Sequence, residues 1–190
     1  MYKKLNIRKK MKKQIINIIR QFEAKYLQRN ERDFAYELYH QIRSLELPPN
    51  VEVTCDTIKR RFNYNDRIIN DPLIRKYFFQ DEVNENTRIH RYPDLLIHEY
   101  ETTRNQLLAI EIKNNFSRTS LKRDIAKLAV YCCGKLKYQY GVLIILNRNR
   151  DNIIRIPDVK EMLIQFPKIE IWLVNENDFE VINSKSFNII

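Results

Sequence analysis

The chain has 190 residues and a formal net charge of +10, from 34 Lys and Arg side chains against 24 Asp and Glu side chains. Its hydrophobic fraction of 44% is sufficient for a folded core, which excludes a wholly disordered chain. The only two glycines, Gly134 and Gly141, lie too far apart for a Walker loop or a GxGxxG dinucleotide turn.

The cysteines, histidines and apolar runs exclude further classes. Three Cys residues without a CxxC pair indicate a reducing compartment rather than a disulfide framework. Three scattered His residues without an HExxH motif argue against zinc. No apolar run approaches the ~20 residues of a membrane span, and no apolar signal-peptide core follows the basic N-terminus. We therefore expect a cytoplasmic protein that is not associated with membranes.

Most of the excess charge lies in residues 1–30, which hold ten basic side chains and one acid. Apolar residues recur there at helical spacing, which predicts a basic amphipathic helix. They are Met11, Ile15, Ile18, Ile19, Phe22 and Tyr26. Such a helix can cover the domain with a solvated basic face, supply phosphate contacts, or lie on an anionic membrane surface. We interpret residues 1–30 as a helical extension and residues 31–190 as the main domain.

The main domain begins with a predicted helix from about Arg32 to Leu45, which Pro48 and Pro49 end. Val51–Thr54 is a candidate short strand and Thr57–Phe62 a candidate helical turn. Ile74–Phe79 is rich in β-forming residues and is a candidate first strand.

Two short apolar runs, Leu95–Ile97 and Leu107–Ile112, flank the polar segment Tyr100–Asn105, which predicts a hairpin. A helix follows, with Thr119 or Ser120 as its candidate N-cap. The apolar face of this helix consists of Leu121, Ile125, Leu128, Cys132 and Leu136.

Gly141–Leu146 is continuously apolar, as expected of a strand covered on both faces. Pro157 is expected to open a helix that runs to Phe166, and Ile169–Val174 is the last predicted strand. The alternation of helices and strands predicts one mixed α/β layer rather than two domains.

Charged residues interrupt the hairpin where a core strand should have none. Asp94 opens its first strand, and Glu111 and Lys113 end its second. Because strand side chains alternate, Glu111 and Lys113 share one face. If the connection is symmetric about Thr102 and Thr103, the numbers of facing residues sum to 205, and Asp94 lies across from Glu111 with Cβ atoms ~5 Å apart.

Two close carboxylates repel each other and are costly to bury, and a divalent cation resolves that conflict. Carboxylate oxygens suit Mg²⁺, which keeps several water molecules for a substrate or nucleophile. An adjacent Lys can orient or deprotonate a metal-bound water. Asp94, Glu111 and Lys113 therefore form the predicted catalytic set.

With Pro93-Asp94 before one strand and Glu111-Ile112-Lys113 ending the next, the chain resembles the PD-(D/E)xK nuclease superfamily, which has the restriction endonuclease-like fold. The resemblance covers roughly residues 31–175. It implies a mixed β-sheet core flanked by helices in α-β-β-β-α-β order. It also implies Mg²⁺, for which Mn²⁺ can substitute, bound by Asp94, Glu111 and the backbone of Ile112. Glu37 is the candidate for a further ligand, which many members carry on the helix before the sheet.

The same resemblance implies polar groups that face the site from the helix after the second hairpin strand. Asp124, Lys127 and Tyr131 share one flank of that helix. The candidate nucleic-acid contacts are Lys127, Lys122, Arg123, Tyr131 and Arg91. None of the aromatic residues can be assigned to a base-stacking surface from the sequence.

Three functions remain open at this point. The first is a metal-dependent nuclease, most simply a DNA endonuclease, which as a homodimer could cut both strands. The second is a non-catalytic nucleic-acid-binding protein that retains the nuclease fold. The third is an interaction or membrane-surface protein acting through residues 1–30. The three motif residues favour the first.

Overall fold

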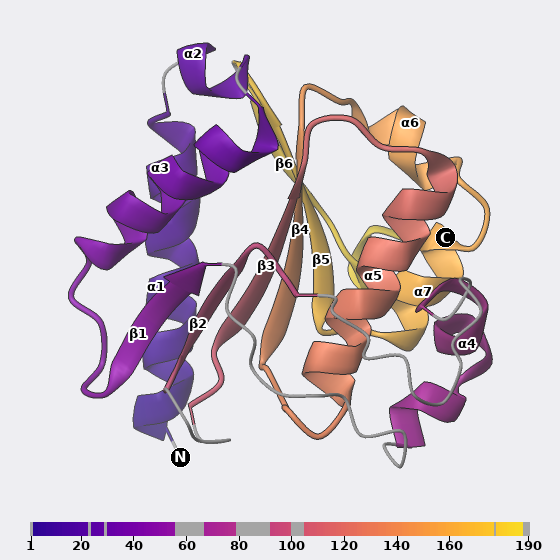
Figure 1. Ribbon diagram of the computed structural model, residues 1–190, viewed down its shortest axis with the longest axis horizontal. Coiled ribbons are helices and arrows are strands. Elements are labelled where there is room, and N and C mark those ends of the chain that lie inside the picture. Colours follow the sequence, from indigo (N-terminus) through magenta and orange to yellow (C-terminus); the bar gives the residue numbers. More distant parts are fainter. Residues whose placement is uncertain are drawn as a thin grey trace.

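A six-stranded mixed β-sheet forms the centre of the computed structural model, which describes residues 2–22, 24–28, 30–55, 67–78, 92–99, 105–176 and 178–187. Helices cover both faces of the sheet (Figure 1). The strands follow one another across the sheet in chain order. They are β1 (Val51–Cys55), β2 (Leu95–Glu99), β3 (Leu108–Lys113), β4 (Tyr140–Leu146), β5 (Ile169–Asn175) and β6 (Asp178–Ile182).

The direction of the strands changes across the sheet. β1, β2 and β3 pair antiparallel, β3, β4 and β5 pair parallel, and β6 returns antiparallel to β5. Parallel neighbours need a crossover, and helix α5 (Arg118–Cys133) supplies it between β3 and β4. The predicted α/β class and mixed sheet are therefore confirmed.

The helices divide into two layers. α1 (Tyr2–Arg20) and α3 (Glu31–Arg43) pack on one face, and α4 (Pro72–Phe78), α5 and α7 (Val159–Gln165) pack on the other (Figure 1). The short elements are α2 (Ala24–Leu27), α6 (Arg150–Ile154), and the 3-10 turns η1 (Arg67–Asn70) and η2 (Ser184–Phe187).

Alternation along β3 sorts its side chains between these layers. Ile110 and Ile112 belong to the core beneath α1 and α3, whereas Ala109 belongs to the core beneath α5. Glu111 shares the Ala109 face because side chains two residues apart on a strand point the same way. The next strand is buried throughout Gly141–Leu146, which confirms that it is covered on both faces.

The basic helix α1 is part of this packing. Met11, Ile15 and Ile19 are buried in the same core as the strands, and Lys12 pairs with Glu170 of β5 at 2.6 Å. The predicted amphipathic helix is thus confirmed over α1, which covers the sheet. Because residues on both sides of position 30 share this core, the packing does not set the N-terminal segment apart as a separate unit.

The prediction of a strand over Ile74–Phe79 is wrong, because Ile74–Phe78 lies in α4, and Phe79 lies outside the described residues. Pro72 suits a first helical turn, and Asp71 Oδ1 accepts the backbone N–H groups of Leu73 and Ile74 at 2.9 and 3.3 Å. These local caps override the β propensity of the apolar residues. The first strand is instead the other candidate, β1, while Thr57–Phe62 lies outside the described residues.

Three other boundaries differ from prediction. Ser117, rather than Thr119 or Ser120, caps α5, and its side chain exchanges capping-box hydrogen bonds with Ser120. The helix predicted from Pro157 begins at Val159, after the separate helix α6. β5 is not the last strand, because the half-buried strand β6 adds to its edge.

Candidate active site

The β2–β3 hairpin has the register expected from its symmetry. Leu95 pairs with Ile110, Leu96 with Ala109 and Ile97 with Leu108, and each pair of numbers sums to 205. Continued by one residue, this register sets Asp94 level with Glu111. Glu111 lies on the α5 side of the sheet, because Ala109, two residues before it on β3, belongs to the core on that side.

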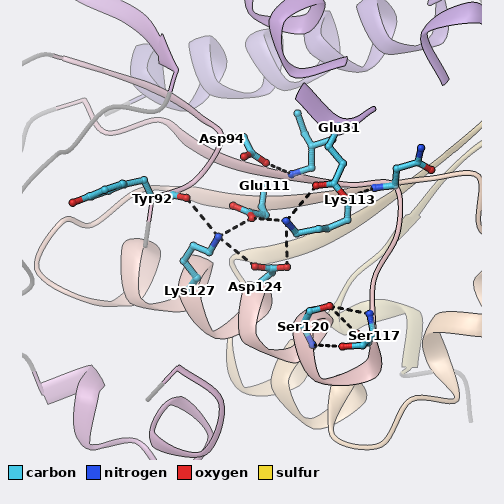
Figure 2. Close-up of polar contacts among 11 residues, drawn as sticks. Glu31, Tyr92, Asp94, Glu111, Lys113, Ser117, Ser120, Asp124 and Lys127 are labelled. Atoms are coloured by element: carbon cyan, nitrogen blue, oxygen red, sulfur yellow. Dashed lines mark hydrogen bonds and ion pairs between the residues drawn. The ribbon is translucent and has the colours of Figure 1, made fainter. Parts of the chain in front are cut away.

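Asp94 is held against β3 by a backbone contact. Its Oδ2 accepts the N–H of Ile112 at 2.7 Å, immediately after the last ladder pair. This bond fixes the carboxylate beside the residue that separates Glu111 from Lys113 (Figure 2). The predicted Pro-Asp and Glu-x-Lys elements therefore meet in space.

Helix α5 contributes two further charges from its second and third turns. Lys127 Nζ lies 2.7 Å from Glu111 Oε1 and 3.3 Å from Asp124 Oδ1. Lys113 Nζ lies 3.2 Å from Glu111 Oε1 and 3.9 Å from Asp124 Oδ2. Figure 2 shows these four side chains facing one another between β3 and α5. The predicted flank of α5 thus does face the site, through Asp124 and Lys127.

The acid that α3 supplies is Glu31 rather than Glu37. Glu31 Oε1 accepts the N–H of Asn114 at 2.9 Å, and its Oε2 lies 3.6 Å from Lys113 Nζ. Glu37 instead accepts a hydrogen bond from Gln41 on its own helix. Six residues along a helix amount to ~9 Å of rise and a turn of roughly 240°, so Glu31 and Glu37 cannot serve the same position.

Sequence reasoning missed Glu31 because it started this helix at Arg32. The available signal was local: Asn30 is an N-cap, and its side chain accepts the N–H of Asp33 at 2.9 Å. A cap at Asn30 makes Glu31 the first helical residue, where the helix dipole favours an acid.

Burial dominates the electrostatics of Glu111, which is only 2% exposed. Loss of water raises the pKa of the Glu111 carboxyl to about 8, and the attraction of Lys127 and Lys113 offsets this only in part. Asp94 and Asp124 push the pKa in the same direction as burial. Burial likewise raises the pKa of Asp94, against the N–H of Ile112 and the two lysines. Burial is therefore the main reason that these two carboxyl groups hold their protons more tightly than free ones.

The neighbouring carboxylates also shift the pKa of Lys113. Burial disfavours its charged form, but the carboxylates of Glu111, Asp124 and Glu31 outweigh burial and raise the pKa of the ammonium group well above its ordinary range. Lys113 is therefore a cation at neutral pH in this arrangement, which suits it to stabilising negative charge and orienting a ligand.

The six charged groups of this cluster suit a divalent cation by charge and by donor type. When every group is ionised, four carboxylates against two ammonium groups leave a formal charge of −2. Within the described residues, the buried Oε2 of Glu111 has no hydrogen-bond partner. This oxygen is therefore available as a ligand for a hard cation such as Mg²⁺. The cluster's carboxylates are those of Glu31, Asp94, Glu111 and Asp124.

The cluster is nevertheless not arranged as a metal centre as it stands. In the described part of the chain, no three His, Cys, Asp or Glu side chains are grouped to hold a metal ion. Lys113 and Lys127 lie between the carboxylates instead (Figure 2). A cation bound there would have to displace at least one ammonium group.

The other predicted nucleic-acid contacts lie in different surroundings. Lys127, with a side chain 9% exposed, is a buried partner of Glu111. Lys122 points toward α4, with Nζ 4.7 Å from the ring centroid of Tyr77. Tyr131 is buried and lies 5.7 Å from the Tyr138 ring. Arg123 is half-buried, and Arg91 lies outside the described residues.

Comparison with family models, with curated proteins and with solved structures found no match to this chain. Over the residues that the structure describes, no helix has both the length and the apolar character needed to cross a bilayer.

Proposed function

We propose that this chain is a metal-dependent phosphodiesterase that cleaves DNA, with a restriction endonuclease-like core and a site built from Asp94, Glu111 and Lys113. The observation that carries the proposal is that Asp94, Glu111 and Lys113 meet in one cluster with further charged groups of α3 and α5, whose formal charge is −2 when all six groups are ionised. Perturbed carboxyl groups gathered on one sheet face are typical of a functional site.

The arrangement of elements supports the same proposal. α3, β1, β2, β3, α5 and β4 occur along the chain in α-β-β-β-α-β order, with η1 and α4 inserted between β1 and β2. The β2–β3 hairpin carries the motif residues. A fold alone does not set a function, so the weight rests on the site. The basic surface of α1, with Lys10, Lys13 and Arg20 exposed, adds an attraction for a polyanion.

Asp94, Glu111, Glu31 and the backbone carbonyl of Ile112 are the groups that would hold Mg²⁺ or Mn²⁺. When bound, such an ion stabilises charge on a phosphoryl oxygen and lowers the pKa of its bound water. Asp94 is pre-positioned by its bond to the Ile112 N–H, and Glu31 by its bond to the Asn114 N–H. Lys113 would stabilise developing negative charge and orient the attacking water rather than accept its proton.

The test is cleavage of plasmid and labelled oligonucleotide DNA in Mg²⁺, Mn²⁺ or EDTA. Asp94→Ala and Lys113→Ala should abolish metal-dependent cleavage, whereas Lys160→Ala, at an exposed position of α7, should cut like the wild type. If wild type and both site variants cut equally well, the site assignment is wrong.

A second comparison separates Glu31 from Glu37. Glu31→Gln should lower the cleavage rate by at least about 10- to 100-fold, the loss that removal of even an outer-shell partner of a metal site causes. Glu37→Gln should leave it within twofold. Binding of DNA without cleavage in either metal would favour the alternative, a nucleic-acid-binding protein that retains the fold.

A further inference from the structure

A cavity of about 440 Å³ opens beside the charged cluster, between α3 and the strand ends. Glu31 and Asp94 line it, together with Ala35 and with Cys55 at the end of β1. Its volume falls within the range of small-ligand sites, roughly 300–1,000 Å³. Because Glu31 and Asp94 belong also to the cluster in Figure 2, the cavity continues the proposed active site toward α3.

The remaining described lining residues are Arg32 and Tyr36. Tyr36 is 38% exposed, and within the described ranges only Ile164 is another exposed large hydrophobic residue. Arg32 donates to the Tyr36 hydroxyl from Nε at 3.1 Å and from Nη2 at 2.9 Å. The guanidinium carbon of Arg32 lies 5.3 Å from the centroid of the Tyr36 ring, which is a cation–π contact. The two side chains therefore line the cavity as a pair.

We propose that Tyr36 and Arg32 form a nucleotide-binding subsite that stacks one unpaired base beside the scissile phosphate, so that the substrate is single-stranded DNA. An exposed aromatic ring offers a face to any base, and an adjacent guanidinium meets the backbone phosphate. The inference rests on the proposed function for the position of the scissile phosphate.

The preference for a single strand follows from the geometry of stacking. In a duplex each base is paired and covered by its neighbours, so an aromatic side chain can reach only a base that is unpaired or splayed out. The subsite lines the same cavity as Asp94 and Glu31 of the cluster. A duplex would therefore gain nothing from Tyr36.

The same helix offers a matched control. Arg43 Nη1 donates to the Tyr39 hydroxyl at 3.1 Å, and its guanidinium carbon lies 5.5 Å from that ring centroid. This second Tyr–Arg pair lines a different cavity along β1, whose lining includes no residue of the charged cluster. Tyr39→Leu thus removes an equivalent pair from α3 without touching the subsite.

The experiment measures binding of a short single-stranded DNA carrying 2-aminopurine, whose fluorescence falls on stacking, in EDTA to prevent cleavage. Tyr36→Leu should weaken binding about 5- to 100-fold and abolish the quenching, while Tyr36→Trp retains both. Tyr39→Leu should bind like the wild type, and the matching duplex should bind wild type and Tyr36→Leu equally. Equal binding of the single strand by wild type and Tyr36→Leu, or equal losses on both DNA forms, overturns the inference.

Cleavage of the same strand in Mg²⁺ or Mn²⁺ separates the two proposals. Binding that depends on Tyr36 without any cleavage supports the subsite and refutes the nuclease. Cleavage abolished by Asp94→Ala, with binding independent of Tyr36, refutes the subsite and leaves the nuclease standing. Circular dichroism of Tyr36→Leu distinguishes a lost subsite from a lost fold.

Discussion

Replacement of Glu111 by Gln should change how the stability of the metal-free protein depends on pH. In the unfolded chain Glu111 loses its proton near its ordinary pKa of 4.5, whereas in the folded chain burial raises that pKa to about 8. Between these values the folded state binds more protons than the unfolded state. The free energy of unfolding therefore falls as pH rises through this window.

The size of the effect follows from the two pKa values. A single carboxyl that titrates near 8 when folded and 4.5 when unfolded costs about 3 kcal/mol of stability between pH 5 and pH 8. Glu111→Gln removes this titration but keeps an oxygen that can accept from Lys127. Measured against the wild type, the variant should thus gain about 3 kcal/mol as pH rises from 5 to 8.

Urea denaturation in EDTA at several pH values measures this difference by linear extrapolation. Glu161→Gln, an exposed carboxylate on α7, is the control and should keep the same offset from the wild type at every pH. If the unfolding free energies of wild type and Glu111→Gln change in parallel from pH 5 to pH 8, the pKa of Glu111 is not raised in the folded protein. The lysines around Glu111 would then compensate fully for its burial. The charge basis for a divalent cation would then be lost.

Three further predictions concern the metal, the basic helix and the sheet. Mg²⁺ at a hundred times its dissociation constant should raise the unfolding free energy of the wild type by about 2.7 kcal/mol, as followed by thermal melts. Asp94→Asn should lose most of that gain, and an equal gain in wild type and variant would refute the ligand assignment. Lys12→Met leaves the Glu170 carboxylate, whose side chain is 10% exposed, without its cation. The variant should lose about 1–2 kcal/mol of unfolding free energy in urea denaturation. An unchanged midpoint would show that this ion pair does not hold α1 on the sheet. Gly141→Ala places a Cβ 2.7 Å from Ile169 Cδ1 and should cost about 1–3 kcal/mol by the same measurement, with wild-type stability as the contrary result.

The predictions that held depend on local periodicity or on counting along one hairpin. The alternation in Ala109–Lys113 assigned Glu111 and Lys113 to one face, and the symmetric connection gave the register that brings Asp94 level with Glu111. Strand side chains have a period of two, so a short apolar run determines both its face and its partner. The same holds for α1, whose buried residues recur at helical spacing.

The predictions that failed concern choices made by neighbours distant in sequence or by capping groups. Ile74–Phe79 has β-forming residues, but Asp71 and Pro72 start a helix that packs on α5. Glu37 is the candidate for a ligand on α3, yet Glu31 is the residue that reaches Lys113. Propensity acts within a few residues, whereas these outcomes depend on where the end of a helix meets the sheet.

The amino-acid sequence by itself determined the class of the fold, the hairpin and the carboxylates placed on it, because hydrophobic spacing and turn symmetry act over short stretches of chain. Only the tertiary structure decided that Lys127 is buried against Glu111, that Glu31 completes the cluster, and that Tyr36 stands beside it. Burial is the physical reason. Removing a charged side chain from water is costly, so a buried charge needs a partner of opposite charge. Which residue becomes that partner depends on how the layers pack, and the spacing of residues in the sequence does not show it.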